Sequence, residues 1–368
     1  MSGDSFWEPT RRQPRDIPVK ATKEGVTMKD GLFFPAEWYP QSGVQLTWPH
    51  RETDWKDNLE EVTGCYIALS KEILKREKLL VACQDAREVA AYFTAGERAN
   101  LLLHEVPSND SWTRDHGGVG LLDGGRPLLI DFGFNGWGLK FAANLDNRIT
   151  RHLYDRSAYL PDVRYLNRLD FILEGGSIET DGTGTLLTTS RCLLSPNRNG
   201  ALNREQVEEQ LKLTLGVKRV LWLNHGFLEG DDTDSHIDTL ARFCDEKTIA
   251  YVACDDEEDI HHGELKEMER ELRAFVTPGG EPYRLLPLPM ADALYHEGRR
   301  LPATYANFLI INGAVLMPCY GSPKDDVAKR QLQTAFPDRE VIGIDCQPLI
   351  KQSGSLHCVT MQLPAGFL

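Results

Sequence analysis

The chain has 368 residues, of which 41% are hydrophobic and 26% are charged, and its formal net charge is −14. This composition is ordinary for a globular protein with a large core, and the negative charge argues against nucleic acid and anionic membranes as partners while favouring a cationic ligand. No stretch reaches the roughly 18 apolar residues that suggest a membrane span. The eight cysteines lack close pairs of the metal-binding type and no secretory apolar segment opens the chain, so we expect a reduced, cytoplasmic protein.

The first 30 residues are rich in charge and proline and show no sustained period. We expect them to form a poorly ordered N-terminal extension, followed by a single globular domain over residues 31–368. That domain begins with an alternating strand at 43–48, which Pro49 stops. A hairpin is predicted at 308–317, where Asn312-Gly313 provides the turn between two apolar runs.

A helix followed by a strand recurs along this domain. In one copy Gly216 is placed to cap the C-terminus of the helix. Five copies, roughly 55 to 85 residues apart, indicate α/β modules of βαβ type in a radial repeat, because one module is too small to bury its own apolar face. An ordinary α/β sheet with similar strands is the alternative that this periodicity leaves open. The predicted pairs are 59–76 with 78–83, 204–215 with 217–223, 263–275 with 283–289, and 325–336 with 339–345, and a weaker copy ends at 163–166.

Residues 230–243 place a titratable histidine beside carboxylates. In an extended segment His236 and Asp238 face the same side, and Ile237 between them could pack on the core and hold the pair in place. A solvated acidic loop is the alternative for a single His-x-Asp pair, because titratable residues also cluster for structural reasons.

The loop 109–118 follows an apolar strand and contains Trp112, Arg114 and Asp115. Polar groups this dense at the end of a strand indicate a site. Pairing of Arg114 with Asp115 to brace the turn is the structural alternative.

The loop 132–138 interleaves aromatic residues, including Trp137, with glycines. Glycine lets backbone approach closely, and the rings could wall a pocket or contact a cation. Packing of these rings in the core is the alternative.

Glu174 lies between the apolar run 171–173 and Gly175-Gly176, which is an unusual place for a random surface carboxylate. Residues 180–184 then predict a hairpin turn into a strand at 186–188. Glu174 is therefore a candidate site residue.

Cys358 is the candidate nucleophile, because it follows a Gly-Ser turn at the start of a predicted strand, where it can meet solvent and substrate. The other seven cysteines lie mostly in apolar segments and are expected to be inert. A thiol needs a nearby cation to become a thiolate, which His236 or a cationic substrate could supply. His357 is expected to point the opposite way in the strand, so we do not assign it as the base.

One cysteine, one histidine and several carboxylates suit a guanidinium substrate, which is planar and always charged. Six segments in this order resemble the agmatine deiminase family, also described as Porphyromonas-type peptidyl-arginine deiminases, within the guanidine-modifying pentein superfamily. The resemblance covers the chain from about residue 34 to the C-terminus. The segments are FPAEW (34–38), NDSWTRD (109–115), FNGWG (134–138), LEGGS (173–177), GDDTDSHID (230–238) and LHCVT (356–360).

The resemblance implies an α/β pentein fold, a five-bladed pseudo-symmetric propeller, for a single catalytic domain at 31–368. It also implies that Cys358 attacks the guanidinium carbon, that His236 is the general acid and base, and that the path runs through a covalent amidino-cysteine. Asp115 and Asp238 would bind the guanidinium nitrogens, and Glu174 would orient His236 and touch the substrate. No metal or organic cofactor is implied. The tryptophans Trp38, Trp112 and Trp137 are further candidates for substrate contacts.

The expected substrate is agmatine, converted to N-carbamoylputrescine and ammonia for polyamine synthesis. Free arginine and peptidyl arginine carry the same reacting group and stay as alternatives. The sequence also departs from the family pattern before the cysteine, where residues 353–356 replace the more common Gly-Gly-Gly-Asn-Ile, and at Gly138-Leu139, where Gly-Gly is frequent. The chemistry is compatible with these departures, which bear on the choice of substrate. A homodimer is one assembly that the sequence leaves open.

Two other classes compete with this interpretation. Residues 234–238 also match the Asp-x-His-x-Asp pattern of binuclear manganese ureohydrolases, which release urea through a metal-bound hydroxide. Those enzymes need a second aspartate cluster and a further histidine, which we do not find at suitable spacing, and Cys358 would be unexplained. A non-catalytic cation-binding relative is the third reading, and an intact set of cysteine, histidine and acids argues against it.

Overall fold

The computed structural model describes residues 31–368, so the extension expected at 1–30 lies outside the described residues. Within the described part, five sheets contain the same module. Two strands form an antiparallel pair, and a helix leads from the second of them to a third strand that pairs with it in parallel. The α/β modules predicted from the recurring helix and strand are therefore present.

Four of the modules are continuous in sequence, whereas the fifth joins β19 (Thr360–Pro364) from the end of the chain to β2 (Gln41–Thr47) near its start. This antiparallel pairing ties the two ends of the domain together. The fifth module continues with α1 (Leu59–Leu74) and β3 (Lys78–Cys83). The others are β5 (Val119–Asp123), β6 (Arg126–Gly133), α5 (Ile149–Asp155) and β7 (Arg164–Ile172); β8 (Ile178–Thr180), β9 (Thr185–Thr189), α7 (Arg204–Leu215) and β10 (Arg219–Leu223); β11 (Ala241–Asp245), β12 (Thr248–Ala253), α8 (His262–Ala274) and β13 (Arg284–Pro289); and β16 (Leu309–Ile311), β17 (Ala314–Cys319), α9 (Lys324–Ala335) and β18 (Glu340–Asp345).

The predicted helix and strand pairs are confirmed, with bounds that shift by a few residues. Helix α7 shows the local cause. Asn203 and Gln206 form a reciprocal capping box at its N-terminus, and Gly216 ends it in the left-handed region at φ 71°. The predicted Asn312-Gly313 turn likewise joins the antiparallel strands β16 and β17.

Short elements complete the fold. Strand β1 (Leu32–Phe33) pairs with β5, β4 (Leu101–Glu105) extends the sheet beyond β3, and β14 (Tyr295–His296) pairs with β15 (Arg299–Arg300). None of the helices in residues 31–368 is long and apolar enough to cross a membrane. The short helices are α2 (Ala86–Ala91), α3 (Thr113–His116), α4 (Gly136–Leu139), α6 (Ser190–Leu193) and α10 (Gln347–Ile350), and a 3₁₀ helix, η5, spans Ile237–Thr239.

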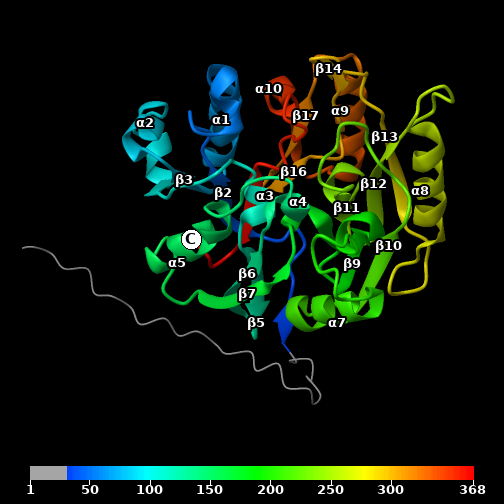
Figure 1. Cartoon of the computed structure of the whole chain (residues 1–368), viewed down its shortest axis with the longest axis horizontal. Coiled ribbons are helices and arrows are strands. Elements are labelled where there is room, and N and C mark those ends of the chain that lie inside the picture. Colours follow the sequence, from blue (N-terminus) through cyan, green and yellow to red (C-terminus); the bar gives the residue numbers. More distant parts are fainter. Residues whose placement is uncertain (1–30) are drawn as a thin grey trace, which may run out of the picture.

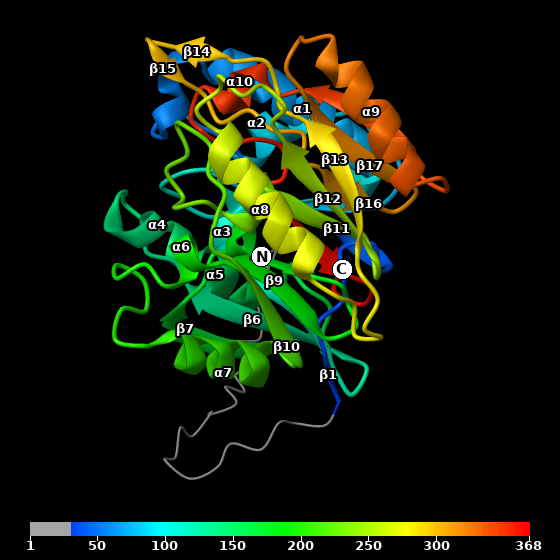
Figure 2. The ribbon, with the colours of Figure 1, turned by 90° about the vertical axis from the view of Figure 1, so that its right-hand side faces the viewer.

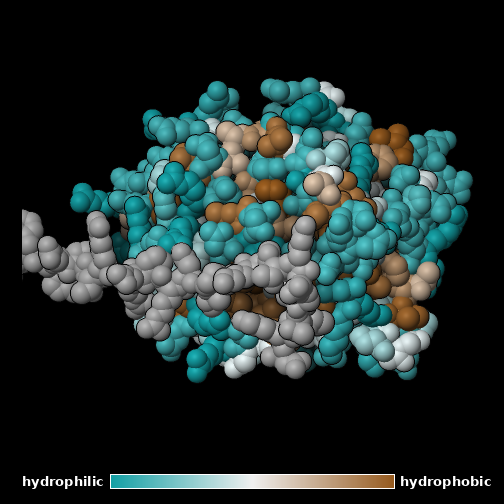
Figure 3. All heavy atoms as spheres, turned by 60° about the horizontal axis from the view of Figure 1, so that its bottom comes forward, coloured by the Kyte–Doolittle hydropathy of each residue, from teal (hydrophilic) through white to brown (hydrophobic). Residues whose placement is uncertain are grey.

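The long helices lie on the outside of the molecule. In Figure 1, α1, α9, α8, α7 and α5 lie at the periphery, with the strands on their inner side. Figure 2 shows α8 lying over the neighbouring strands, with which it is in contact. The face toward the viewer in Figure 3 is mainly hydrophilic, with apolar side chains gathered near its middle.

Charged side chains are buried in the interior, between the apolar clusters that the helices and strands enclose. Arg242 of β11 is fully buried, and its Nε lies 2.8 Å from Glu179 Oε2 while its Nη2 lies 3.0 Å from Glu37 Oε2. Buried charges are tolerated when they are paired in this way. The interior is therefore able to hold a polar site that water does not reach freely.

Candidate active site

A cavity of about 590 Å³ opens where loops from several modules meet. Cys358 and Asp115 line it together with the side chains of Trp112 and Trp137. Side chains from residues 54–61, from the β14–β15 hairpin and from residues 351–354 also line it. The cavity is thus built from segments that are far apart in the sequence.

Cys358 lies in a turn two residues before β19, so the expectation that it starts the strand is wrong by a short distance. Asn307, which the sequence analysis did not identify, holds this turn. Its Oδ1 accepts the backbone N–H groups of His357 at 2.9 Å and of Cys358 at 3.4 Å, and it also lies 3.4 Å from Cys358 Sγ. Burial raises the pKa of the Cys358 thiol, and the nearby carboxylates of Asp238 and Asp115 raise it further. The free protein therefore holds a thiol at this position.

Asp115 of α3 is fixed by two donors. Its Oδ1 accepts the backbone N–H of Gly176 at 2.9 Å, and its Oδ2 accepts the Trp137 indole N–H at 2.8 Å. Trp137 reaches it from a backbone in the left-handed region, φ 55°, between Gly136 and Gly138, both of which also have positive φ. Burial raises the pKa of Asp115 to about 6.

His236 precedes η5 and is buried. Its Nδ1 lies 3.6 Å from Asp115 Oδ1, and its Nε2 has no hydrogen-bond partner among the described residues. Burial lowers the pKa of His236, but Asp115, Cys192 and Glu174 outweigh this effect and raise it well above its usual value. We therefore take His236 to be an imidazolium in the free protein.

Asp238 lies within η5 rather than in an extended strand, and it is fully buried. Its Oδ2 accepts a hydrogen bond from His357 Nδ1 at 2.7 Å, whereas its Oδ1 has no partner in residues 31–368. Burial raises the pKa of Asp238, but the hydrogen bond from His357 and nearby positive charges lower it below the usual value. Asp238 is therefore an ionised carboxylate with one free oxygen.

Gly176 is the point where these groups converge. A Cβ at this residue would lie 2.6 Å from His236 Nδ1, 2.8 Å from Asp115 Oδ1 and 3.2 Å from Asp238 Oδ1. Only a glycine lets the three atoms approach this closely. Helix α3, the residue before η5 and η5 itself thus bring together the predicted histidine and both predicted aspartates.

Glu174, expected to orient His236 and touch the substrate, is fully buried. Both of its carboxylate oxygens lie 2.9 Å from Arg198 Nε, and no hydrogen bond to His236 is present. Arg198 also donates to Asp234 Oδ2 and to the Thr233 carbonyl. The sequence analysis missed Arg198, which links Glu174 to the loop that carries His236.

Glu174, Cys192 and His236 place potential metal ligands within 4.8 Å of one another. However, Arg198 occupies both oxygens of Glu174, so we do not assign a metal site here. The Asp-x-His-x-Asp pattern of the ureohydrolase alternative does not converge, because the Asp234 carboxylate pairs with Arg198 and Lys140. Cys192, expected to be inert, lies beside His236 and contributes to its raised pKa.

The three tryptophans have different positions. Trp112 and Trp137 line the cavity, and the Trp112 indole donates to Asp110 Oδ2 at 3.2 Å. Trp38 does not line it; its ring packs against two of the hydrophobic clusters, and its carbonyl accepts a hydrogen bond from Arg339. We therefore leave Trp38 out of the site proposed below.

Comparison with known proteins shows that the chain is a hydrolase acting on amidine C–N bonds. The chain belongs to the Porphyromonas-type peptidyl-arginine deiminase family, whose model matches residues 33–364.

Several relatives resemble the chain over almost its whole length. A Porphyromonas gingivalis protein, described as a "putative arginine deiminase", has a structure with 57% sequence identity and a TM-score of 0.89, covering 92% of this chain and 99% of that one. The substrate-bound structure of a C. jejuni agmatine deiminase is 38% identical with a TM-score of 0.86, covering 94% and 100%. The agmatine deiminase of Stutzerimonas stutzeri is 31% identical, covering 92% of this chain and 97% of the relative.

Proposed function

We propose that this protein deiminates agmatine to N-carbamoylputrescine and ammonia. The observation that carries the proposal is the convergence of His236 Nδ1, Asp115 Oδ1 and Asp238 Oδ1 beside Gly176, in the surroundings of Cys358. Asp238 Oδ1 is buried without a partner, which is costly unless a ligand supplies a donor. A guanidinium supplies several coplanar N–H donors and a positive charge. The names of the relatives support the same substrate.

The chemistry follows from the protonation states of these groups. The bound guanidinium, held by Asp115 and Asp238, places a cation beside Cys358 and favours its thiolate. The sulfur forms a bond to the guanidinium carbon, the imidazolium of His236 donates a proton to the departing nitrogen, and the thiol proton passes to the imidazole. The C–N bond breaks, and the ammonia takes this proton from His236 and leaves as ammonium, so that a neutral imidazole faces a positively charged amidino-cysteine on Cys358.

Hydrolysis of this intermediate completes the cycle. His236 takes a proton from a water molecule, whose oxygen attacks the same carbon, and the C–S bond breaks. The product carries a neutral ureido group, the second proton of the water restores the thiol of Cys358, and His236 is again the imidazolium with which the cycle began. Glu174 supports this exchange by helping to keep His236 protonated, and Arg198 holds Glu174 in place.

The charges that line the cavity favour a substrate with a second positive charge. Seven carboxylates line the cavity against three lysine or arginine side chains, so its field is negative. This excess of acid attracts the distal ammonium of agmatine and opposes the carboxylate of free arginine. The acidic lining residues are Asp54, Asp57, Glu61, Asp110, Asp115, Asp232 and Glu297, and the basic ones are Lys56, Arg299 and Lys351.

We also propose that the five modules form a five-bladed pseudo-symmetric propeller with the site at its centre. The repeated topology and the origin of the site residues in different modules support this arrangement. The expected setting is a reduced cytoplasm, since the eight cysteines are free thiols. The reaction as written needs no metal or organic cofactor, and its partner is the small cationic substrate.

The proposal is tested by incubating the purified protein with agmatine and measuring ammonia and urea in parallel, with EDTA or iodoacetamide added to separate samples. We expect ammonia that EDTA leaves unchanged and that alkylation abolishes. Urea that disappears with EDTA would make the protein a metal-dependent ureohydrolase instead. Free arginine and an arginine-containing peptide, assayed at the same concentration, test the substrate: kcat/KM should be highest for agmatine.

A further inference from the structure

His357 is held between two carboxylates. Its Nδ1 lies 2.7 Å from Asp238 Oδ2 and its Nε2 lies 2.8 Å from Glu37 Oε2, and all three side chains are buried. The side chain was expected to point away from the site as part of a strand. It does not line the substrate cavity and points into the charged interior, but it does so from the turn that carries Cys358, because the strand begins only at Thr360.

The two short contacts decide the charge of His357. Burial raises the pKa values of Glu37 and Asp238, but Arg242 lowers both and the contacts with His357 lower them further, so we take both carboxylates as ionised. An ionised carboxylate only accepts hydrogen bonds, so both ring nitrogens of His357 must donate. Burial and two neighbouring guanidiniums work in the other direction and lower the pKa of His357. The geometry requires two N–H groups, and on that ground we take the ring as an imidazolium.

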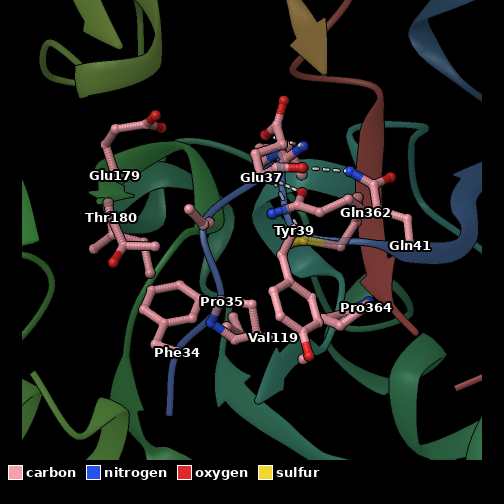
Figure 4. A pocket seen from close by; sticks show the side chains of 16 residues that line it. Phe34, Pro35, Glu37, Tyr39, Gln41, Val119, Glu179, Thr180, Gln362 and Pro364 are labelled. Carbon is pink, nitrogen blue, oxygen red and sulfur yellow. Dashed lines mark hydrogen bonds and ion pairs between the residues drawn. The ribbon is translucent and has the colours of Figure 1, made fainter. Parts of the chain in front are cut away.

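Glu37 is itself firmly held. Its Oε1 accepts the Ile310 backbone N–H at 2.7 Å, and its Oε2 lies 3.0 Å from Arg242 Nη2 and 3.7 Å from Arg114 Nη2. Glu37 lines a small cavity of about 30 Å³. In Figure 4, Gln41 and Gln362 lie near Glu37 at one end of this cavity, and the apolar Phe34 and Val119 also line it. Asp238 is thus connected through His357 to a part of the interior that does not line the substrate cavity.

We propose that His357 is a positioning residue for deimination: held as an imidazolium by Glu37, it fixes Asp238 Oδ2 and leaves Asp238 Oδ1 turned toward the guanidinium. This inference rests on the proposed function, because it gives a role to the carboxylate that binds the substrate. It also assigns a task to Glu37, whose FPAEW segment is otherwise remote from the chemistry.

The prediction for pH dependence follows from the groups around Asp238. These are His357 and Cys358 from the turn, Asp115 and Arg114 from α3, His236 from the residue before η5, and Arg242 from β11. Without the imidazolium, the pKa of Asp238 would rise, because burial would then be opposed only by the charges of His236 and Arg242. At acid pH, both Asp115 and Asp238 would then have to lose a proton before a guanidinium binds, whereas in the wild type only Asp115 must do so.

The experiment measures kcat/KM for agmatine against pH in the wild type, His357→Gln and Glu37→Gln. In the wild type we expect log kcat/KM to fall at acid pH with a slope of one. In both variants the slope on the acid side should approach two, because two carboxylates must lose a proton. The pH at which log kcat/KM begins to fall should also be higher than in the wild type. For His357→Gln, kcat/KM at neutral pH should fall about 10- to 100-fold, the equivalent of one hydrogen bond to a charged group, mainly through KM.

His261→Gln is the matched control. His261 is also buried and also pairs with a carboxylate, Asp259, at 2.6 Å, but it has no contact with Asp238. This variant should keep the slope of one and stay within about twofold of the wild-type kcat/KM. The proposal would be overturned if folded His357→Gln and Glu37→Gln keep a slope of one and lose activity at the same acid pH as the wild type.

A second readout does not depend on turnover or on the folding of variants. In ¹⁵N NMR spectra of the wild type, the two ring nitrogens of His357 should both carry protons at pH 7. A ring with a single N–H would overturn the proposal even if agmatine is deiminated. A wild type that releases no ammonia from agmatine would overturn the proposed function, while the spectrum would still decide the state of His357.

Discussion

Two buried histidines lie near the same carboxylates and are held in opposite ways. His357 has a carboxylate oxygen within 2.8 Å of each ring nitrogen. His236 has its nearest carboxylate oxygen at 3.6 Å from Nδ1, and its Nε2 lacks a partner among the described residues. A ring whose hydrogen bonds are complete is fixed in charge and orientation, whereas a ring with free bonding capacity can exchange protons with a substrate. The difference separates a positioning group from a reacting one.

The same contrast applies to the aspartates and to the thiol. Asp115 has donors on both oxygens, while Asp238 keeps one oxygen free. Cys358 Sγ lies 3.4 Å from the Asn307 amide oxygen, and burial, Asp238 and Asp115 raise the pKa of the thiol more than its hydrogen bonds to Ser355 and Asn307 lower it. The thiol therefore depends on the cationic substrate for activation.

The largest effect is expected for Cys358→Ser. The hydroxyl is a far weaker nucleophile than a thiolate, and turnover of agmatine should fall by at least about 1,000-fold. The melting temperature should stay close to that of the wild type, because the substitution replaces one small side chain by another. Ammonia release from this variant at the wild-type rate would contradict the covalent mechanism.

His236→Asn should lower kcat by about 100- to 10,000-fold, the usual contribution of a general acid and base. This exceeds the loss expected for His357→Gln, which acts through Asp238. The two variants measured side by side test the distinction between a reacting and a positioning histidine. Equal losses with identical pH profiles would remove that distinction.

Gly176→Ala should lower kcat/KM by about 10- to 100-fold. Its Cβ would crowd His236 Nδ1 and Asp115 Oδ1 at less than 3 Å, and such overpacking also costs about 1–3 kcal/mol of stability. Gly64→Ala is the control, since its Cβ meets nothing within 4 Å on helix α1 and should raise stability by about 0.5–1 kcal/mol. Wild-type kcat/KM in Gly176→Ala would show that the atoms beside Gly176 do not bind the substrate.

Glu174→Gln should lower the free energy of unfolding by about 1–3 kcal/mol, because it removes the charge that pairs with the buried Arg198. Turnover should fall as well, since His236 loses one of the carboxylates that favour its protonated form. Chemical denaturation and steady-state kinetics measure the two effects separately. Unchanged stability would show that the Glu174 and Arg198 pair contributes nothing to the fold.

The smallest expected effect is the change of kcat/KM with pH. Asp115 has a pKa of about 6, so kcat/KM should fall up to tenfold per pH unit below about 6 as this carboxylate becomes neutral. Its contribution to stability has the opposite sign: the folded protein binds this proton more tightly than the unfolded chain, so the contribution declines as pH rises from about 4 to 6. Activity that stays constant down to pH 5 would contradict the role of Asp115.

Much of the fold and of the site could be predicted because the signals are local. The capping of α7 by Asn203 and Gly216 and the Asn312-Gly313 turn depend on neighbouring residues, and the recurring helix and strand follow from periodicity. The predicted cysteine, histidine and aspartates were likewise recognisable from six short segments. The structure brings them into one site.

The interactions that could not be predicted join residues distant in sequence. Asn307 holds the Cys358 turn, Arg198 binds Glu174, and Glu37 reaches His357 across more than three hundred positions. Nothing in the local pattern around Arg198 or Asn307 distinguishes them from other polar residues. His357 was expected in a strand after the Gly-Ser turn, but that strand begins three residues later.

The central claim is that the sulfur of Cys358 bonds to the guanidinium carbon. The most direct test mixes the wild type and His236→Asn with agmatine, quenches the reactions in acid over a time course, and maps modified peptides by mass spectrometry. We predict a mass increase equal to agmatine minus ammonia on the peptide that contains Cys358, lasting longer in His236→Asn, where the attacking water lacks its base. Ammonia release with Cys358 unmodified at every time point, or the same mass increase on another residue, would contradict the claim.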